Sequence, residues 1–412
     1  MSPDADLVER RVRMDAAMEQ GGAWPEDSPW LREAMAALPR DLFAPDRLWR
    51  WDECAYVAMD RATDAGGWAD ELYGDVNGAA ITQVTDGLPS SSLSAPGVVA
   101  DMLDSLMLEP GHTVWDVGGG QGWTCALAAW RAGPGRVVST EVDERLAAFA
   151  RGRLAAAGVD AEVLAGDATH AGPPDGARVD RLHATYAVEA VPWGWVEATK
   201  PGGRIVYPWG RLGHVALTVA DDGRSATGWV QGLAQFMADR RGPAPTRGDH
   251  ATYTAVREGG GPEVRQVVER DPAPLADDWH LRFAVRVAVP DAVVLTGRGE
   301  DGANVWFHDG DRSWAALSAD GDGGAVLFQG GPRRIGDEVM TAWSQWEALG
   351  SPELYDYGIT VTPEKQWAWQ GSPGGPRWPV AQATPVAPVA QAAPAAPVAQ
   401  AAPATPVAPL GR

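Results

Sequence analysis

The chain is poor in the residues that build disulfide frameworks and metal centres. Its 412 residues include only two cysteines, Cys54 and Cys125, and seven histidines with no pair at metal-ligand spacing. These absences exclude a disulfide scaffold and a zinc-type site as the basis of the fold. We expect each cysteine to be a small buried side chain and no metal to be bound.

Basic residues and long apolar runs are also scarce. The formal net charge is −21, from 34 basic and 55 acidic residues. Nucleic acid is therefore not an expected partner, because contacts to phosphates need a basic surface. No uncharged apolar run approaches the roughly 20 residues of a membrane span. No signal peptide is visible near the N-terminus. We expect a reduced, cytoplasmic protein without a membrane partner.

Composition divides the chain into four parts, and its hydrophobic content of 45% is enough for substantial cores. We expect a helical, Trp-rich segment at residues 1–75, a strand–helix domain at 76–240 and an α+β unit at 246–371. Residues 379–412 repeat Pro-Val-Ala-Gln and carry no charge before the last residue. Dense proline prevents helix or sheet, so we expect a disordered tail, a passive spacer rather than a binding segment.

The pattern D-x-G-x-G-x-G at residues 116–122 lies between a predicted strand and a predicted helix that starts at Trp123. Glycine is needed where the backbone takes positive φ or must lie against a ligand. A turn of this kind at a helix N-terminus builds a nucleotide or nucleoside pocket. A dinucleotide fingerprint would need glycine at position 123. An acidic loop instead suits the cationic sulfonium and ammonium groups of S-adenosyl-L-methionine. The loop contributes four candidate cofactor-binding residues: Asp116, Gly118, Gly120 and Gly122.

The next two predicted strands each lead into an acid. Glu141 follows the first and is placed to accept hydrogen bonds from ribose hydroxyls. Gly166 and Asp167 follow the second, where the carboxylate can reach an adenine amino group. A glycine-rich turn in another doubly wound fold remains the alternative. Strands are expected at 113–117, 135–140, 161–165, 179–184 and 200–206.

Alternation of strands and helices predicts a parallel sheet with helices on both faces. The predicted fold class is α/β: a Rossmann-like class I S-adenosylmethionine methyltransferase, with a helical N-terminal segment and a C-terminal α+β extension. In the extension, a helix is expected with an apolar face from Ile335 to Leu349. Antiparallel strands are expected at 281–287, 292–295, 304–307, 314–317 and 325–328, and the segment 355–361 follows the helix.

A second motif, Leu-Pro-Ser-Ser-Ser-Leu-Ser-Ala-Pro at residues 88–96, precedes a predicted helix. It resembles the acceptor motif of protein-L-isoaspartate O-methyltransferases, roughly T-I-S-(Q/A)-P. Residues 38–45 resemble the V-P-R-x-x-F-x-P segment of that family, and residues 199–206 resemble its Lys-Pro-Gly-Gly segment. The resemblance covers about residues 35–235.

The resemblance implies two candidate catalytic residues. Ser94 matches the serine whose hydroxyl lies at the methyl-accepting carboxylate, and Ser92 matches the preceding threonine of the motif. A carboxylate is already nucleophilic, so the enzyme must only hold its oxygen in line with the sulfonium methyl. A hydroxyl orients the carboxylate without neutralising it. The simpler interpretation is a serine-rich helix N-cap.

The chain departs from the family in two places. Residues 183–189 read His-Ala-Thr-Tyr-Ala-Val-Glu where the family often has Thr-Ala-Ala-Ala, and about 130 residues with predicted structure follow residue 240. Both departures fit a branch that modifies ribosomally made peptides (lanthipeptides, graspetides, lasso peptides). In that branch, methylation of an Asp leads to aspartimide and then isoaspartate.

Two alternatives stay open: a general repair enzyme for isoaspartyl or D-aspartyl proteins, and a non-catalytic scaffold with the same fold. The expected partner is a peptide or protein that bears Asp or isoaspartate, and we expect the C-terminal unit to grip it.

Overall fold

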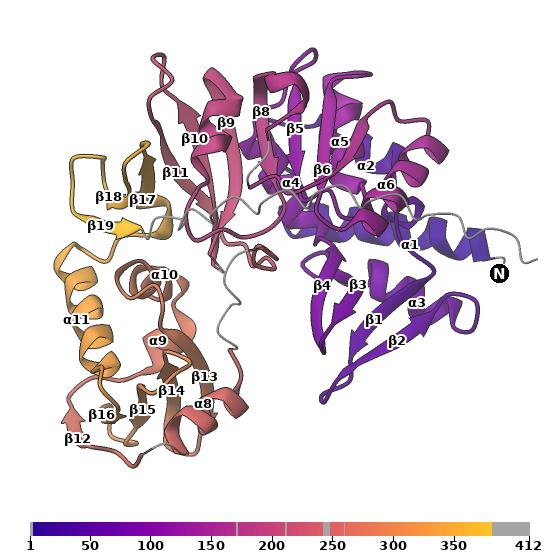
Figure 1. Ribbon diagram of the computed structural model, residues 1–412. Helices are drawn as coiled ribbons and strands as arrows, with labels where there is room; N and C mark the ends of the chain where they lie inside the picture. The colour runs from indigo at the N-terminus through magenta and orange to yellow at the C-terminus, as the bar shows by residue number, and fades with distance from the viewer. Residues whose placement is uncertain (1–2, 170–171, 211, 242–247, 259, 381–412) are drawn as a thin grey trace, which may run out of the picture.

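The computed structural model describes residues 3–169, 172–210, 212–241, 248–258 and 260–380. A ten-stranded sheet forms its centre (Figure 1). The parallel part, in spatial order, is β7 (Glu162–Ala165), β6 (Val137–Glu141), β5 (Val114–Val117), β8 (Val179–Ala184) and β9 (Thr199–Trp209). The antiparallel part continues with β10 (Gly213–Val219), β11 (Ala226–Gly232), β17 (Tyr357–Val361), β18 (Gln366–Gln370) and β19 (Arg377–Val380).

The order of the parallel strands is that of a doubly wound sheet, as predicted. From β5 the chain moves outward to β6 and β7, and then returns to β8 and β9 on the other side of β5. The carboxyl ends of β5 and β8 therefore frame the crevice where ligands bind in such sheets. The helices of this region are α4 (Pro96–Ser105), α5 (Trp123–Ala132), α6 (Glu144–Ala156) and α7 (Trp193–Ala198).

The N-terminal part combines helices with a second sheet of four strands. The helices are α1 (Pro3–Gln20), α2 (Trp30–Ala37) and α3 (Ala65–Tyr73). The sheet order is β2 (Tyr56–Asp60), β1 (Arg47–Trp51), β3 (Ala80–Thr85) and β4 (Leu88–Leu93). The segment 1–75 is thus not helical throughout, and the expected boundary at residue 75 cuts through this sheet. Leu48 is buried while its neighbours Arg47 and Trp49 are more exposed, which is the period of a strand rather than a helix.

The C-terminal part is an α+β arrangement, as predicted. Its helices are α8 (His250–Glu258), α9 (Ala273–Asp277), α10 (Trp279–Ala288) and α11 (Ile335–Ala348). Its sheet order is β12 (Val264–Val268), β16 (Ala325–Gly330), β15 (Trp314–Ala319), β14 (Gly302–His308) and β13 (Val293–Gly299).

The strand expected at residues 281–287 is wrong, because this segment is helix α10. The Asp278 side chain accepts hydrogen bonds from the backbone N–H groups of His280 and Leu281, which caps a helix N-terminus. Leu281 and Val285, one helical turn apart, are both buried. Apolar residues on several sides of this short helix gave the sequence an alternating pattern typical of a strand.

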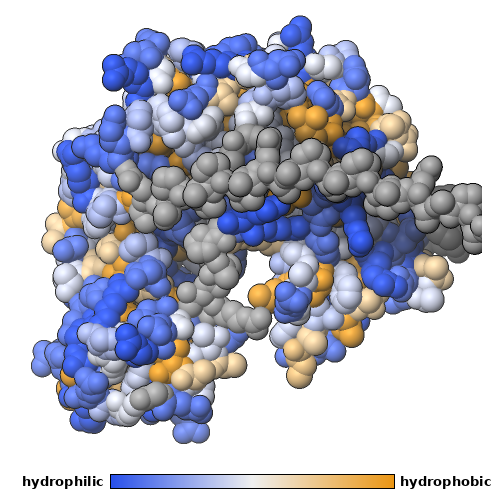
Figure 2. Space-filling model, in the orientation of Figure 1, coloured by the Kyte–Doolittle hydropathy of each residue, from blue (hydrophilic) through white to orange (hydrophobic). Residues whose placement is uncertain are grey.

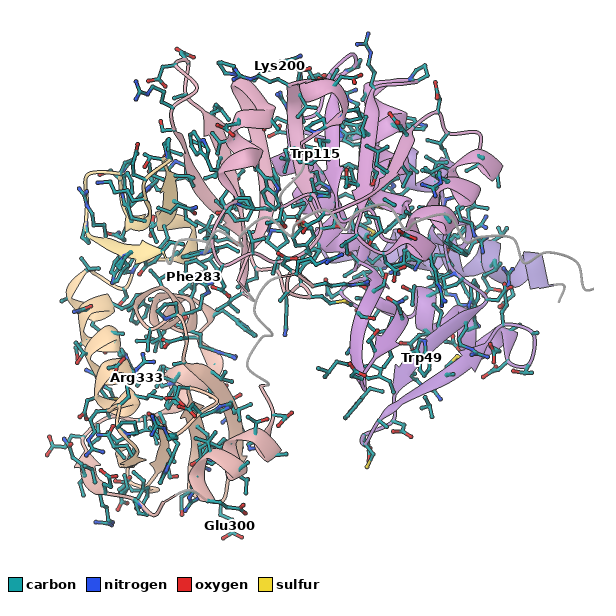
Figure 3. The ribbon with its side chains drawn as sticks, in the orientation of Figure 1. Trp49, Trp115, Lys200, Phe283, Glu300 and Arg333 are labelled. Atoms are coloured by element: carbon teal, nitrogen blue, oxygen red, sulfur yellow. The ribbon has the colours of Figure 1, made fainter. Side chains whose placement is uncertain are left out.

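The C-terminal part does not form a separate unit beside the methyltransferase sheet. Strand β17 pairs with β11, so the last three strands complete the central sheet. Phe283 of α10 is buried, with its ring centroid 5.9 Å from Trp209 and 5.4 Å from Tyr357 (Figure 3). One hydrophobic core runs from β8–β11 to α11 and β14–β16, and another fills the opposite face beneath α4–α6. The expected boundary at residue 246 therefore crosses a shared core.

Three further predictions concern the C-terminal tail, the two cysteines and membrane-spanning helices. Pro379 and Val380, expected in the tail, lie in β19, and residues 381–412 lie outside the described residues. Cys125 is buried as expected, whereas Cys54 is exposed, and both thiols are free. Within the described ranges, no helix is long and apolar enough to cross a membrane.

Candidate active site

The glycine loop joins β5 to α5 at the carboxyl edge of the sheet. Gly118, Gly120 and Gly122 have φ angles of 84°, 52° and 88°, which favour glycine. A Cβ atom at Gly118 would lie 2.6 Å from Cδ1 of Tyr186, and one at Gly122 would lie 3.2 Å from Cβ of Ala150. These two glycines therefore allow neighbouring elements to pack tightly against the loop.

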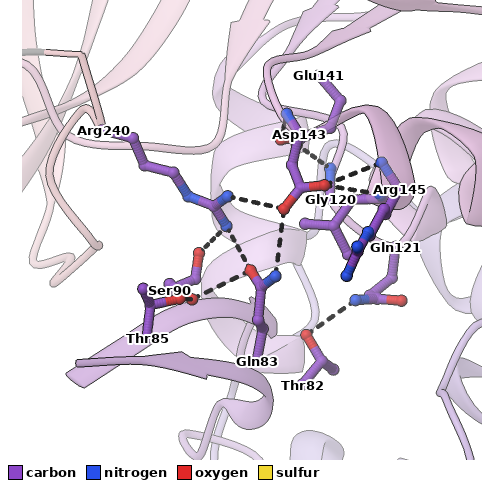
Figure 4. Close-up of polar contacts among 11 residues, drawn as sticks. Thr82, Gln83, Thr85, Ser90, Gly120, Gln121, Glu141, Asp143, Arg145 and Arg240 are labelled. Atoms are coloured by element: carbon purple, nitrogen blue, oxygen red, sulfur yellow. Dashed lines mark hydrogen bonds and ion pairs between the residues drawn. The ribbon is translucent and has the colours of Figure 1, made fainter. Parts of the chain in front are cut away.

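Gly120 faces strand β4, which carries the acceptor motif. A Cβ atom there would lie 3.8 Å from Oγ of Ser91 and 4.0 Å from the carbonyl oxygen of Ser92. The next residue, Gln121, donates a hydrogen bond from Nε2 to Oγ1 of Thr82 at 2.9 Å (Figure 4). The β3–β4 hairpin and the glycine loop, which are separate in sequence, thus lie against each other.

Asp116 supports the loop from inside the protein. Its side chain is fully buried, and its carboxylate accepts a hydrogen bond from Oγ of Ser139 at 2.7 Å. Nδ1 of His183 lies 3.4 Å from the other carboxylate oxygen. Oγ1 of Thr124 is 3.5 Å from that same oxygen. The carboxylate is therefore held by neighbouring strands and α5, and its negative charge lies beneath the loop rather than on its surface.

Glu141 ties the end of β6 to the glycine loop. Its Oε2 accepts the Gly120 N–H at 2.8 Å, and its Oε1 accepts the Asp143 N–H at 2.9 Å. The Gly166 N–H donates to the backbone oxygen of Glu141 at 2.9 Å. The side chain of Asp167 accepts the Thr169 N–H at 2.9 Å. The fold thus brings the predicted residues Gly120, Glu141, Gly166 and Asp167 to one edge of the sheet.

The position of Ser94 depends on a residue that the sequence analysis did not single out. Ser94 follows β4, and its backbone oxygen accepts a hydrogen bond from Nη2 of Arg40 at 3.0 Å. The same nitrogen donates to the oxygen of Leu93 at 3.0 Å, and Nη1 donates to the oxygen of Leu72. Arg40 is fully buried, and burial lowers its pKa to about 10, so it stays charged at neutral pH. The signal was present in the sequence, because Arg40 lies in the Leu-Pro-Arg-Asp-Leu-Phe motif.

The segment after β8 closes the other side of the loop. Oγ1 of Thr185 donates a hydrogen bond to the backbone oxygen of Gly118. Tyr186 packs against Trp195, with ring centroids 6.0 Å apart. The His183–Glu189 departure from the family pattern thus supplies a hydroxyl and an aromatic ring at the cofactor loop.

The residues at this edge fit S-adenosyl-L-methionine. The loop backbone leaves no room for side chains at Gly118, and the acids Glu141 and Asp167 stand at the ends of successive strands. Carboxylates accept hydrogen bonds from hydroxyl and ammonium groups, and their charge complements a cationic ligand. Gln121 adds a buried Oε1 without a hydrogen-bond partner among the described residues, so it is a further acceptor that sequence reasoning missed.

Comparison with known proteins gives matches to the family that the sequence motifs resemble. Residues 26–227 match the family model of protein-L-isoaspartate(D-aspartate) O-methyltransferase. A protein-L-isoaspartate O-methyltransferase of Aeropyrum pernix is 34% identical over 228 residues, which are 54% of this chain and 76% of the relative. The corresponding protein of Methylorubrum extorquens is 34% identical over 216 residues, covering 52% of this chain and 80% of the relative.

Other matches cover less or are more distant. A Methanopyrus kandleri protein of the same name is 42% identical over 122 residues, so the chain spans 54% of its length and the match covers 29% of this chain. A solved protein-L-isoaspartate O-methyltransferase aligns with a TM-score of 0.47 and 17% identity, covering 86% of this chain and 97% of that one. A Plasmodium falciparum structure, described as a complex with S-adenosyl-L-homocysteine, aligns with a TM-score of 0.41 and 15% identity. It covers 55% of this chain and 96% of that one.

Two independent lines therefore agree. The fold presents a cofactor loop with an acceptor motif beside it, and relatives more than 30% identical are covered over three quarters of their length or more. On these grounds the chain is a member of the protein-L-isoaspartate O-methyltransferase family.

Proposed function

We propose that this chain methylates the free carboxylate of an isoaspartyl residue in a protein or peptide, with S-adenosyl-L-methionine as the methyl donor. Membership of the family places the chain among carboxyl O-methyltransferases that use this cofactor. The observation that carries the proposal is the closeness of Gly120 in the cofactor loop to the acceptor strand, where a Cβ atom at Gly120 would lie 3.8 Å from Oγ of Ser91 and 4.0 Å from the backbone oxygen of Ser92.

The methyl transfer requires that the acceptor carboxylate be positioned correctly, and it does not require a strong base. The bound cofactor supplies an electrophilic methyl group. In this proposal Ser94 would donate a hydrogen bond to one oxygen of the acceptor carboxylate, and the other oxygen would attack the methyl group. Arg40 fixes the backbone on both sides of that position by binding the oxygens of Leu93 and Ser94. No proton has to move in the methyl transfer, because the carboxylate is ionised at neutral pH.

A narrower candidate function is the tailoring of a ribosomally made peptide, in which an ordinary Asp is methylated and then cyclises to aspartimide. Support comes from residues beyond the family match that reach the loop after β8. Gln366 accepts the Val191 N–H at 2.9 Å and donates to the Val191 oxygen at 2.6 Å. Arg286 forms an ion pair with Glu189 at 2.7 Å. The extension can thereby shape the acceptor side of the site.

Competition between substrates separates the two functions. The full chain is incubated with labelled S-adenosyl-L-methionine and three peptides of one sequence: isoaspartyl, linear Asp and cyclised Asp. Repair-type activity predicts methyl transfer to the isoaspartyl peptide above all. Turnover of the cyclised Asp peptide alone would favour tailoring and contradict our main proposal. The Ser94→Ala variant controls for methylation elsewhere.

A further inference from the structure

The segment that follows β11 crosses the carboxyl edge of the sheet. Residues 237–239 run beside the segment after β8: the Ala187 N–H donates to the Met237 oxygen at 2.8 Å, and the Asp239 N–H donates to the Ala187 oxygen at 3.0 Å. Oγ1 of Thr169 lies 3.4 Å from the Asp239 carboxylate. The backbone of this segment is therefore anchored above β8, close to the cofactor loop.

Arg240 extends from this anchored segment to the acceptor hairpin. Its Nη2 donates hydrogen bonds to Oε1 of Gln83 on β3, at 3.0 Å, and to the backbone oxygen of Ser90 on β4 (Figure 4). Ser90 also donates from Oγ to the same Gln83 oxygen at 3.0 Å. A single guanidinium thus binds both strands of the hairpin that leads into Ser92 and Ser94.

The same guanidinium binds the donor side of the site. Nη1 of Arg240 lies 3.4 Å from Oδ2 of Asp143, which also accepts a hydrogen bond from Nε2 of Gln83 at 3.2 Å. Asp143 caps the N-terminus of α6 and donates its own N–H to Glu141. Glu141 in turn binds the N–H of Gly120. A chain of hydrogen bonds therefore connects the acceptor hairpin with the cofactor loop through Arg240 and Asp143.

We propose that Arg240 is a positioning residue that holds the β3–β4 hairpin, and with it Ser92 and Ser94, in register with the cofactor loop. The role rests on the proposed function insofar as the hairpin carries the acceptor motif. Arg240 belongs to neither strand of the hairpin. Its contacts therefore add to those that the hairpin makes through its own turn and strand pairing. Its planar fork of donors suits three acceptors in different directions, which a lysine cannot bind in the same way.

The neighbouring Arg241 provides a matched control. It is exposed, and its backbone N–H, rather than its side chain, donates a hydrogen bond to the Asp239 carboxylate. Arg240→Ala and Arg241→Ala remove the same charge at adjacent positions. A difference between the two variants therefore reports the contacts of Arg240 and not the net charge of the protein.

The first measurement is amide hydrogen exchange of residues 80–93 in the full chain, without acceptor peptide. We expect exchange in this hairpin to be about 10-fold faster in Arg240→Ala than in the wild type or in Arg241→Ala, because local opening becomes easier. Exchange in the core strand β5 should stay unchanged in both variants. Equal hairpin exchange in Arg240→Ala and Arg241→Ala would overturn the proposal.

Kinetics supply the second measurement. We expect Arg240→Ala to lower kcat/KM for the acceptor peptide about 10- to 100-fold, and Arg240→Lys to restore part of it. Affinity for S-adenosyl-L-homocysteine, measured by calorimetry, should change much less. If the wild type methylates no carboxylate, the proposed function fails, while the exchange result still decides the role of Arg240. A loss of cofactor affinity as large as the loss of kcat/KM would contradict a role in placing the acceptor.

Discussion

At the scale of single residues, most groups of the site hold the backbone in place, and few can contact the reactants. Asp116 and Arg40 are buried and bind neighbouring strands or carbonyl oxygens. Ser94 is partly exposed at the end of β4, where it can meet an acceptor. This division of roles leads to different expected effects of substitution.

Removing the hydroxyl of Ser94 should impair methyl transfer alone. We expect Ser94→Ala to lower kcat about 10- to 100-fold, because the acceptor carboxylate loses one orienting hydrogen bond. Calorimetric titration should show unchanged affinity for S-adenosyl-L-methionine. Full activity in this variant would remove Ser94 from the mechanism.

Replacing Arg40 should affect both stability and activity. Arg40→Met leaves the buried oxygens of Leu72 and Leu93, and the partly buried oxygen of Ser94, without this donor. We expect the free energy of unfolding to fall by about 3 kcal/mol, since each buried unpaired group costs about 1–3 kcal/mol before relaxation. Urea denaturation measures this change. A variant with wild-type stability and wild-type kcat would show that these contacts are dispensable.

His214 predicts a dependence of stability on pH. It is fully buried on β10, with Nε2 3.3 Å from Oγ of Ser105, and burial together with nearby His183 lowers its pKa from 6.5 to about 3. Between these two values the unfolded chain binds a proton that the folded chain does not, so this contribution to stability is lost as the pH falls through the window. At pH 5 the loss relative to pH 8 is about 2 kcal/mol.

Denaturation of the wild type and His214→Gln at both pH values measures this effect. The difference in unfolding free energy between pH 8 and pH 5 should be smaller in the variant by about that amount. An equal difference in the two proteins would mean that His214 titrates normally in the fold.

Some residues of the candidate site could be identified from the sequence. The glycines, Glu141 and the serines could be identified because their motifs are local. Arg240 could not be identified, because no sequence pattern links it to Gln83, Ser90 and Asp143, which lie 97 to 157 residues away. That contact exists only after β11 has been placed in the sheet.

At the scale of elements, strands and helices agree with their local sequence patterns, except where tertiary packing determined the structure. The strands β5–β7 were predicted from apolar runs that lead into glycine or an acid, and β8 and β9 from the apolar runs at residues 179–184 and 200–206. Helix α10 was predicted as a strand, because its apolar residues face both the central sheet and α11 and so hide the helical period. The pairing of β17 with β11 was not predictable, since more than 120 residues separate the two strands.

Phe283 tests whether α10 belongs to the core of the central sheet. Phe283→Ala removes a buried ring between Trp209 and Tyr357, which should cost about 3–5 kcal/mol. We expect one cooperative unfolding transition in the wild type and an earlier single transition in the variant, followed by tryptophan fluorescence in urea. Two separate transitions, with only one shifted, would indicate an independent C-terminal unit.

At the scale of the whole molecule, two smaller sheets flank the edge of the central sheet where the site lies. In Figure 2 an open gap separates the lobe of β1–β4 from the lobe of β12–β16. Because β17–β19 and α10 are part of the central core, deleting residues 246–412 would remove structure as well as any substrate grip. We therefore expect such a deletion to cause a general loss of stability, so it cannot test by itself whether the C-terminal unit grips the substrate.

We propose above that this chain esterifies an aspartyl-derived carboxylate at the serines beside its glycine loop. The most direct measurement is mass spectrometry of an isoaspartyl peptide and its Asp twin after incubation with S-adenosyl-L-methionine. We expect one added methyl group on the isoaspartyl residue, which mild alkali removes as it must remove an ester, and which is lost in Ser94→Ala. A methyl group that survives alkali, or that forms equally in Ser94→Ala, would contradict it.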